Sequence, residues 1–307
     1  MSDSIHLLTL VPLPAEFIAV LAARYTLMHA PAGPEEARTV QAVLTNGSTG
    51  LSAAQMAALP ALRLVHAFGA GYEAIDLAAA RSRGVIVSHA PGANDATVAD
   101  HAMALLLAVS RGLVPVDRAV KAGGWEGSRA ARPTLNGRRL GIVGMGLIGQ
   151  KIARRAEAFD MQVAYHTRQP RLELPYAHHR SLLALAEASD CLVLACPGGA
   201  VTRHIVNREV LRALGPKGFL VNIARGSVVH TGDLIAALQA GEIAGAGLDV
   251  LEDEPEVPAE LAAMDQVVLT PHMAGRSPEA QRAQLERLMA AVDAVLVAGG
   301  VPANVVS

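Results

Sequence analysis

Aromatic residues and net charge are both scarce in this 307-residue sequence, and each scarcity excludes a class of function. Phe, Trp and Tyr make up 3% of the chain, so few side chains could stack on nucleic-acid bases. The chain has 26 basic and 28 acidic residues, and its net charge of −2 creates no field that attracts a nucleic-acid backbone. We therefore expect a protein that binds no nucleic acid.

Long apolar runs are also missing. No stretch approaches the ~18 uninterrupted apolar residues that a membrane span needs, so the many hydrophobic residues should fill a globular interior. The N-terminal segment MSDSIHLLTLVPLP lacks the basic residues that begin a signal peptide. We expect a cytoplasmic protein with no membrane partner.

Cysteine is the third scarcity, with Cys191 and Cys196 flanking an apolar run that predicts a strand. Side chains five residues apart on a strand face opposite ways, so these two thiols cannot bridge each other. Two thiols are also too few for a zinc site. We expect core thiols in a reducing compartment and no metal site.

Short apolar runs do alternate with helical patterns along the whole chain. The first half predicts strands at 5–10, 40–44, 64–67 and 85–87, and helices at 15–24, 52–58 and 76–83. The second half predicts strands at 140–143, 162–165, 191–195, 219–223, 244–248 and 267–269, and helices at 181–188, 207–214 and 231–240. This alternation predicts right-handed βαβ units, and the length fits two domains. We expect an α/β protein with two doubly wound parallel sheets.

A long helix predicted over 94–110 connects the two halves. It is apolar nearly all round between 102 and 109, so we expect it to be buried between domains or in a homodimer interface. A last helix over 277–297 begins with Ser, Pro and Glu, and should return to the first domain. We expect these domain limits: residues 1–98 with 283–307 for the first, and 99–282 for the second.

The strongest single signal is the segment LGIVGMGLIGQKIARRAEAF at 140–159, where a strand leads through three glycines into a helix. Gly144 permits a tight turn, Gly146 lets the backbone approach a pyrophosphate, and Gly149 lets the helix pack on the strand. The pyrophosphate would lie on the free amides that begin the helix. The predicted cofactor turn comprises Gly144, Met145, Gly146, Leu147, Ile148 and Gly149.

The segment VAYHTRQPR at 163–171 bears on the choice of cofactor. An NAD site has an acidic residue about 20 residues beyond the turn, at the end of the second strand, and this segment has none. His166 takes that position, and Thr167 and Arg168 follow with a hydroxyl and a guanidinium that suit a 2′-phosphate. A solvated basic loop is the alternative interpretation. We predict that NADPH is preferred over NADH.

Polar residues follow three later strands, in the segments NIARG at 222–226, GLDVLEDEP at 247–255 and TPHMAG at 270–275. The carboxyl ends of parallel strands line the ligand crevice, so these loops should converge beside the cofactor. An arginine, a carboxylate and a histidine in one crevice suit the reduction of a carbonyl beside a carboxylate.

With the segment GAGYEAID at 69–76, these motifs resemble those of the D-isomer-specific 2-hydroxyacid dehydrogenases over nearly the whole chain. The chain is most similar to the branch that reduces glyoxylate, hydroxypyruvate and hydroxyphenylpyruvate. The resemblance implies a Rossmann cofactor domain inserted in a flavodoxin-like substrate domain. It also implies NAD(P)H-dependent reduction of a small 2-keto acid to the D-2-hydroxy acid.

The resemblance assigns catalysis to Arg225, which would bind the carboxylate and keto oxygen, to His272 as proton donor, and to Glu254, which would orient His272. The substrate contacts that it implies are Ala70, Gly71, Arg225 and His272. Beyond the glycine turn and the residues at 166–168, the cofactor contacts are Pro197, Ile223, Ala224, Arg225, Asp249, His272 and Gly275, with Asp249 meeting the nicotinamide amide.

The remaining polar residues receive structural interpretations. We interpret three acids of the same loop as solvated, namely Glu252, Asp253 and Glu256. We expect six histidines to be structural or exposed: His66, His89, His101, His178, His179 and His204. The chain departs from the family at 197–202, where PGGAVT has extra glycines in a loop expected near the nicotinamide ribose.

Two other functions remain open. The substrate could instead be an aryl pyruvate or a sugar keto acid, depending on the size of the pocket. A nucleotide-sensing binding protein related to the family's corepressors could retain the same three catalytic residues, although the chain has no long disordered tail and no basic face. A formate dehydrogenase is disfavoured because that branch has Gln where Glu254 stands.

Overall fold

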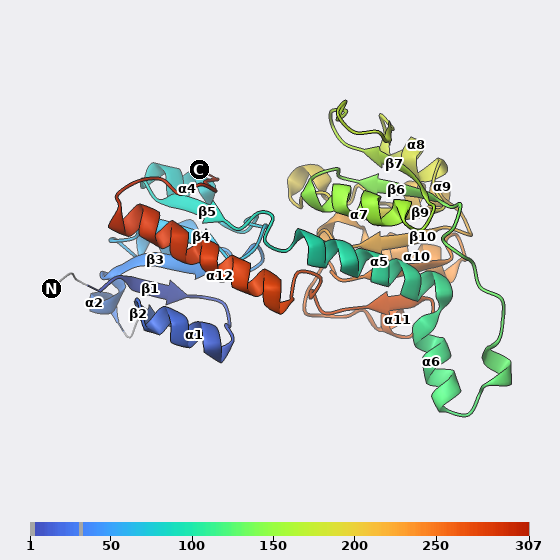
Figure 1. Ribbon diagram of the computed structural model, residues 1–307, viewed down its shortest axis with the longest axis horizontal. Helices are drawn as coiled ribbons and strands as arrows, with labels where there is room; N and C mark the ends of the chain where they lie inside the picture. Colours follow the sequence, from blue (N-terminus) through green and yellow to red (C-terminus); the bar gives the residue numbers. More distant parts are fainter. Residues whose placement is uncertain (1–3, 31–32, 307) are drawn as a thin grey trace. The chain divides into compact units, whose positions relative to one another are not determined.

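The chain forms two compact units in the computed structural model, which describes residues 4–30 and 33–306. One unit combines Met1–Asn94 with Arg276–Ser307, and the other is Asp95–Gly275 (Figure 1). The second unit is thus inserted into the first, with boundaries at Asn94 and Gly275 where the sequence pattern placed them at 98 and 282. The outermost ends of the expected first domain, residues 1–3 and 307, lie outside the described residues.

The first unit contains a parallel sheet in the order β2-β1-β3-β4-β5, which is a flavodoxin-like order. Its strands are β1 (His6–Thr9), β2 (Thr26–Met28), β3 (Val40–Thr45), β4 (Leu64–Ala67) and β5 (Ile86–His89). Its helices are α1 (Ala15–Ala22), α2 (Pro34–Ala37), α3 (Ala53–Ala57), α4 (Leu77–Ser82) and α12 (Pro278–Val292), which continues as the π-helix η4 (Asp293–Val297). The short strand β2 and helix α2 carry too little apolar pattern to have been predicted.

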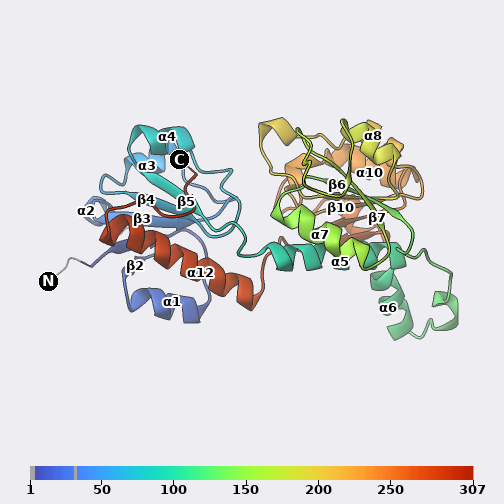
Figure 2. The ribbon, with the colours of Figure 1, turned by 45° about the horizontal axis from the view of Figure 1, so that its top comes forward.

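Helices cover both faces of this sheet. On one face, Leu288 and Val292 of α12 pack with Phe17 and Leu21 of α1, and the two helices lie side by side in Figure 2. On the other face, α3 and α4 contribute to a separate core, around Met56. The predicted return of the last helix to the first domain is therefore observed, and Ser277 caps it by accepting a hydrogen bond from the amide of Ala280.

The second unit contains a parallel sheet in the order β12-β11-β10-β9-β6-β7-β8. Its strands are β6 (Arg139–Val143), β7 (Gln162–His166), β8 (Ala177–His178), β9 (Cys191–Leu194), β10 (Phe219–Asn222), β11 (Gly245–Leu248) and β12 (Val267–Leu269). Its helices are α5 (Asp95–Arg111), α6 (Leu113–Lys121), α7 (Leu147–Glu157), α8 (Leu182–Glu187), α9 (Arg208–Leu214), α10 (Thr231–Gln239) and α11 (Ala259–Ala262), with 3₁₀ turns η1 (Glu126–Ser128), η2 (Ala200–Thr202) and η3 (Gly226–Val228). The predicted class of two doubly wound parallel sheets is confirmed.

The long helix α5 packs within its own unit, against α7 and the sheet. Glycines in β11 permit this close contact: a Cβ at Gly247 would lie 3.0 Å from the Cβ of Leu105, and one at Gly245 would lie 2.8 Å from Val109. Burial against its own sheet accounts for the apolar sequence of this helix.

Helix α6 follows α5 after Gly112, whose φ of 58° is left-handed and breaks the helix. Figures 1 and 2 show α6 lying away from the seven-stranded sheet, and none of its residues is buried. The sequence analysis did not predict this helix, although its apolar residues Leu113, Val116 and Val120 recur at helical spacing. Within the described residues, no helix combines the length and the apolar character that crossing a bilayer requires.

Candidate active site

The glycine turn between β6 and α7 lies where the strand order of the second sheet changes direction, beside β9. Gly144 has a φ of 96°, and a Cβ there would lie 2.7 Å from the backbone of Cys196. A Cβ at Gly149 would collide with the carbonyl oxygen of Gly144. Both positions therefore require glycine, which keeps the turn tight and brings the start of α7 against β6.

The third glycine of the turn, Gly146, is different because it faces open space. No heavy atom of the described residues lies within 4 Å of a Cβ placed there, although the backbone has an ordinary negative φ of −78°. Gly146 also begins α7, and no described side chain caps that end of the helix. The first amides of α7 are thus left for an outside acceptor, and a pyrophosphate fits this arrangement.

The loop after β7 is held in place by histidines. His166 Nδ1 lies 2.9 Å from the carbonyl oxygen of His179, and His178 Nε2 lies 2.9 Å from the carbonyl oxygen of Thr167. The rings of His166 and His178 stack with their centroids 6.3 Å apart. Arg168 is exposed at the tip of this loop. Two of the histidines expected to be structural therefore shape the segment predicted to bind a 2′-phosphate.

Glu254, after β11, and His272, after β12, form the central pair of the site. His272 Nδ1 lies 2.8 Å from Glu254 Oε2, and Glu254 Oε1 accepts a hydrogen bond of 3.1 Å from the amide of Leu251. Partial burial opposes ionisation of Glu254, but the hydrogen bond from His272 holds the pKa of this carboxyl below its usual range. With Nδ1 held by Glu254, Nε2 is the nitrogen through which His272 can act on a substrate.

Asp249 fixes the loop that carries His272. Its Oδ1 accepts hydrogen bonds from the hydroxyl of Thr270 at 2.6 Å and the amide of Met273 at 2.9 Å, while Oδ2 accepts one from the amide of Ala274 at 2.9 Å. His101 Nε2 lies 3.5 Å from Oδ1. Burial opposes ionisation, yet these donors hold the pKa of Asp249 below its ordinary value. In this structure the Asp249 carboxylate holds the 270–274 loop in place. Its contact with a nicotinamide amide stays a prediction.

Arg225 follows β10, the strand between β9 and β11. The buried side chain of Asn222 holds the loop by accepting from the amide of Ala224 at 3.0 Å and donating to the carbonyl of Arg225 at 3.0 Å. A Cβ at Gly198, after β9, would lie 2.6 Å from Arg225 Cγ. Gly198 of the PGGAVT segment thus has a physical reason, since the arginine stem occupies the space of a side chain, whereas Gly199 has a left-handed φ of 114°.

One interpretation of the acidic loop is wrong. Glu252 is not a solvated acid: its side chain is 15% exposed and accepts hydrogen bonds from His204, Arg203 and Thr231. Asp253 and Glu256 are exposed, as expected. The sequence pattern missed Glu252 because its partners lie far along the chain, and it likewise missed His101, which bonds Thr270 at 2.9 Å.

The remaining predicted substrate residues belong to the first unit, in the loop after β4. The carbonyl oxygen of Ala70 lies 2.8 Å from His89 Nδ1, and the ring of Tyr72 meets that of His89 edge-on at 5.1 Å. A Cβ at Gly47 would lie 2.8 Å from the carbonyl carbon of Gly71. The neighbouring loop and a histidine therefore fix the path of the Ala70–Gly71 backbone.

Both cysteines are unsuited to catalysis. Burial raises the pKa of the Cys191 thiol to about 12 and that of Cys196 to about 11. A thiolate nucleophile at neutral pH would need the opposite shift. Arg225, Glu254 and His272, the residues predicted to be catalytic, instead follow three consecutive parallel strands of the sheet.

A parallel sheet in this order, with a glycine turn at its switch point and a histidine–carboxylate pair beyond its carboxyl edge, defines a nicotinamide-nucleotide-dependent oxidoreductase. Residues 103–274 match the family model of the D-isomer specific 2-hydroxyacid dehydrogenase, NAD binding domain. The glyoxylate/hydroxypyruvate reductase A of Arabidopsis thaliana is 37% identical over 300 residues, covering 95% of this chain and 96% of that one. The hydroxyphenylpyruvate reductase of Plectranthus scutellarioides is 40% identical over 260 residues, covering 84% and 83%.

The comparison with solved structures leads to the same family. The NADPH-dependent glyoxylate/hydroxypyruvate reductase of Sinorhizobium meliloti, determined in complex with NADP and malonate, has a TM-score of 0.92 and 37% identity, over 99% of this chain and 97% of that one. The chain therefore belongs to the D-isomer specific 2-hydroxyacid dehydrogenases, a family of oxidoreductases, and its second unit carries the NAD-binding domain of that family.

Proposed function

We propose that this protein reduces a small 2-keto acid of the glyoxylate or hydroxypyruvate type to the D-2-hydroxy acid, with NADPH preferred over NADH. The observation that carries the proposal is the pairing of Glu254, after β11, with His272, after β12; β11 lies beside β10, the strand that leads to Arg225. The reductases of Arabidopsis thaliana and Sinorhizobium meliloti, by the substrates in their names, support the substrate class.

The cofactor would be held by the glycine turn, with its pyrophosphate on the amides at the start of α7. The open space beside Gly146 supports this placement. The nicotinamide supplies the hydride when the cofactor is bound. Residues at the ends of β9 to β12 would surround its ring: Pro197, Ile223, Ala224, Arg225, Asp249, His272 and Gly275.

The preference for NADPH rests on the loop after β7. No carboxylate stands at the end of this strand to repel a 2′-phosphate, and Arg168 is exposed at the tip beside Thr167. A guanidinium offers paired donors to phosphate oxygens. His166 would lie beneath this phosphate, with its Nδ1 already bonded to the carbonyl of His179.

Arg225 binds the carboxylate of the keto acid in this proposal. Its planar fork suits a carboxylate, and Gly198 beside its stem limits where the side chain can swing. Because binding orients the substrate, the keto carbon is held at a fixed position and the keto oxygen faces His272.

His272 donates a proton from Nε2 to the keto oxygen as the carbon is reduced. Glu254 holds Nδ1 and balances the positive charge that the ring carries while it is protonated. The balanced reaction consumes the keto acid, one hydride and this proton, and it gives the 2-hydroxy acid. His272 then regains its proton from solvent.

We further assign the first unit as the substrate-binding domain, with the backbone of Ala70 and Gly71 binding the carboxylate, and the second as the dinucleotide-binding domain. The ordered path of the 69–72 loop, fixed by His89, supports the assignment.

We also propose a homodimer in the cytoplasm. The exposed apolar side chains of Leu113, Val114 and Trp125, on and beside α6, support a second copy as the partner of this surface. Light scattering tests the dimer, and a monomer at working concentration would remove it. The scarcity of cysteine supports the compartment.

An aryl pyruvate is the second candidate substrate, favoured by the similarity to the hydroxyphenylpyruvate reductase. Initial rates with glyoxylate, hydroxypyruvate and phenylpyruvate, each with NADPH and NADH, test both candidates. We expect the highest kcat/KM with NADPH and one of the two small acids. Tight NADPH binding without turnover on any of them would instead support a nucleotide-sensing binding protein.

A further inference from the structure

The loops that carry Arg225 and Glu254 touch backbone to backbone. Gly226 follows Arg225 directly, and a Cβ at Gly226 would collide with the carbonyl group of Leu251. Leu251 in turn donates its amide to Glu254. This junction sets the separation of the arginine and the carboxylate, since neither loop can shift toward the other.

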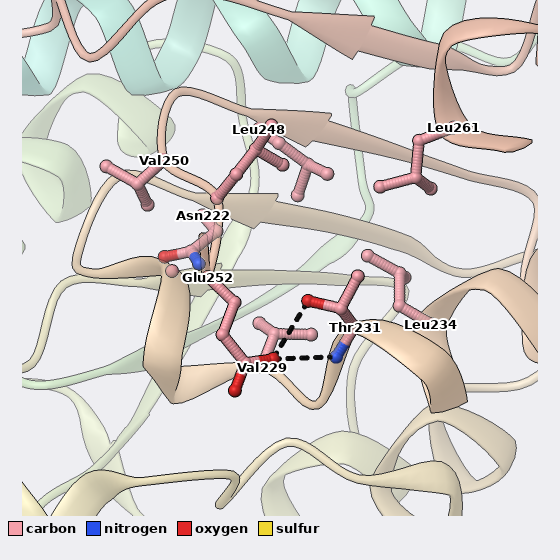
Figure 3. Close-up of a pocket in the computed structure, with 10 residues that line it drawn as sticks. Asn222, Val229, Thr231, Leu234, Leu248, Val250, Glu252 and Leu261 are labelled. Atoms are coloured by element: carbon pink, nitrogen blue, oxygen red, sulfur yellow. Dashed lines mark hydrogen bonds between the residues drawn. The ribbon is translucent and has the colours of Figure 1, made fainter. Parts of the chain in front are cut away.

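Glu252, next to Leu251, ties the same junction to two further segments. Its Oε1 lies 2.5 Å from His204 Nε2 and accepts from Arg203 at 3.0 Å, while its Oε2 accepts from the hydroxyl of Thr231 at 3.0 Å. Figure 3 shows the side chain reaching across a small pocket to the start of α10 at Thr231. Burial opposes ionisation, but the bonds from His204 and Thr231 keep the pKa of Glu252 below its usual range.

The segments that Glu252 joins are themselves paired. The amide of His204 donates to the carbonyl of Ser227, and the amide of Val206 donates to that of Val228. The η3 turn after Arg225 is thus bounded by the 204–206 segment on one side and by Leu251 on the other. Glu252 spans both, so its carboxylate closes a ring of contacts around the Arg225 loop.

We propose that Glu252 is a positioning residue for the reaction, which holds the Glu254 loop in register with the Arg225 loop. The inference rests on the proposed function, because it concerns the residues that act on the keto acid. Glu252 does not touch the substrate; it acts through Leu251 on Glu254, and through the η3 turn on Arg225. Other titratable groups near it are His230, whose ring meets His204 edge-on at 4.8 Å, and Asp233.

Two substitutions at Glu252 and one at its partner test the proposal. Glu252→Ala removes every hydrogen bond of the Glu252 side chain, whereas Glu252→Gln keeps an amide oxygen for Thr231. His204→Asn shortens the side chain that reaches Glu252, and Asn tolerates the left-handed φ of 53° at this position. Glu256→Gln is the matched control, because it removes one negative charge from an exposed position of the same loop.

We expect Glu252→Ala to lower kcat about 100-fold, as for a small displacement of catalytic groups, while the Kd for NADPH stays within about threefold of wild type. The kcat values of Glu252→Gln and His204→Asn should lie between those of Glu252→Ala and the control. Hydrogen exchange at the amide of Leu251 should accelerate in the same order. The acid limb of kcat/KM should move to higher pH, because a displaced Glu254 loses the bond that lowers its pKa.

A merely structural role predicts a different result. If Glu252→Ala lost folded protein in proportion to its lost activity, and kept the wild-type pH profile and Leu251 exchange, the positioning role would be overturned. Rates equal to those of Glu256→Gln would overturn it as well. Wild-type protein that turned over no keto acid would contradict the proposed function instead.

Discussion

His272 Nδ1 and Glu254 Oε2 lie 2.8 Å apart, although the two residues are 18 positions apart and follow different strands. The pair leaves Nε2 as the working nitrogen of His272. We expect Glu254→Gln to lower kcat about 100-fold, because an amide cannot balance the charge of a protonated imidazole. Steady-state rates with saturating NADPH measure this effect, and kcat within a few-fold of wild type would remove Glu254 from the mechanism.

The pH dependence should carry the signature of the same carboxylate. Glu254 has a lowered pKa, so its ionised form persists above that value and is lost as the pH falls through it. We expect the acid limb of kcat/KM to lie below the ordinary Glu pKa of about 4.3, and Glu254→Gln to abolish it. Asp249 also has a lowered pKa, so its contribution to stability is likewise lost as the pH falls. Circular dichroism must therefore confirm that the protein is folded at each pH.

Gly198→Ala should disable Arg225 without altering any charge. The added Cβ would lie 2.6 Å from Arg225 Cγ, so the guanidinium must move and kcat/KM for the keto acid should fall about 100-fold. The Kd for NADPH, measured by fluorescence, should change much less. Gly127→Ala is the control, since no described heavy atom lies within 4 Å of its Cβ. Equal kinetics for the two variants would show that Arg225 does not depend on this contact.

Gly146→Ala should separate cofactor binding from stability. The new methyl group enters open space, so the free energy of unfolding should change by less than about 1 kcal/mol. The Kd for NADPH should rise about tenfold or more, because the methyl group occupies the space of the pyrophosphate. Gly149→Ala should instead lower the free energy of unfolding by about 1–3 kcal/mol, because its added Cβ would collide with the carbonyl oxygen of Gly144. Unchanged NADPH affinity in Gly146→Ala would place the pyrophosphate elsewhere.

Arg168→Ala should lower kcat/KM with NADPH about 10-fold to 100-fold, the effect of one lost charge-assisted hydrogen bond. The kcat/KM with NADH should stay within about threefold of the wild-type value, since NADH has no 2′-phosphate. Arg83→Ala removes the same charge from an exposed position of the first unit and serves as the control. An equal loss with both cofactors would mean that Arg168 supports the loop rather than the phosphate.

Much of the fold and part of the candidate site could be predicted from local sequence patterns. The glycine turn, the strands on either side of it and the last helix were predictable because their signals lie within about 20 residues of one another. The pairing of Glu254 with His272 was predictable for a different reason, since parallel strands end at one edge of a sheet.

Contacts between distant residues were not predictable. His101 lies 169 positions from Thr270, and His204 lies 48 positions from Glu252, so no spacing links them. Glu252 looked like one solvated acid among several because only the folded chain brings His204 and Thr231 to it. Gly198 was read as a departure from the family, and its reason became visible only with the position of the Arg225 stem.

The insertion of one unit into the other gives the chain an order of assembly. The second unit, Asp95–Gly275, is a single continuous segment, whereas the sheet of the first unit needs α12 to cover one face. The amide of Val306 also donates to the carbonyl of Val87 in β5. During synthesis the ribosome therefore delivers a complete nucleotide-binding unit while the earlier segment still exposes the apolar face that α12 will cover. The N-terminal segment, although made first, completes its fold last.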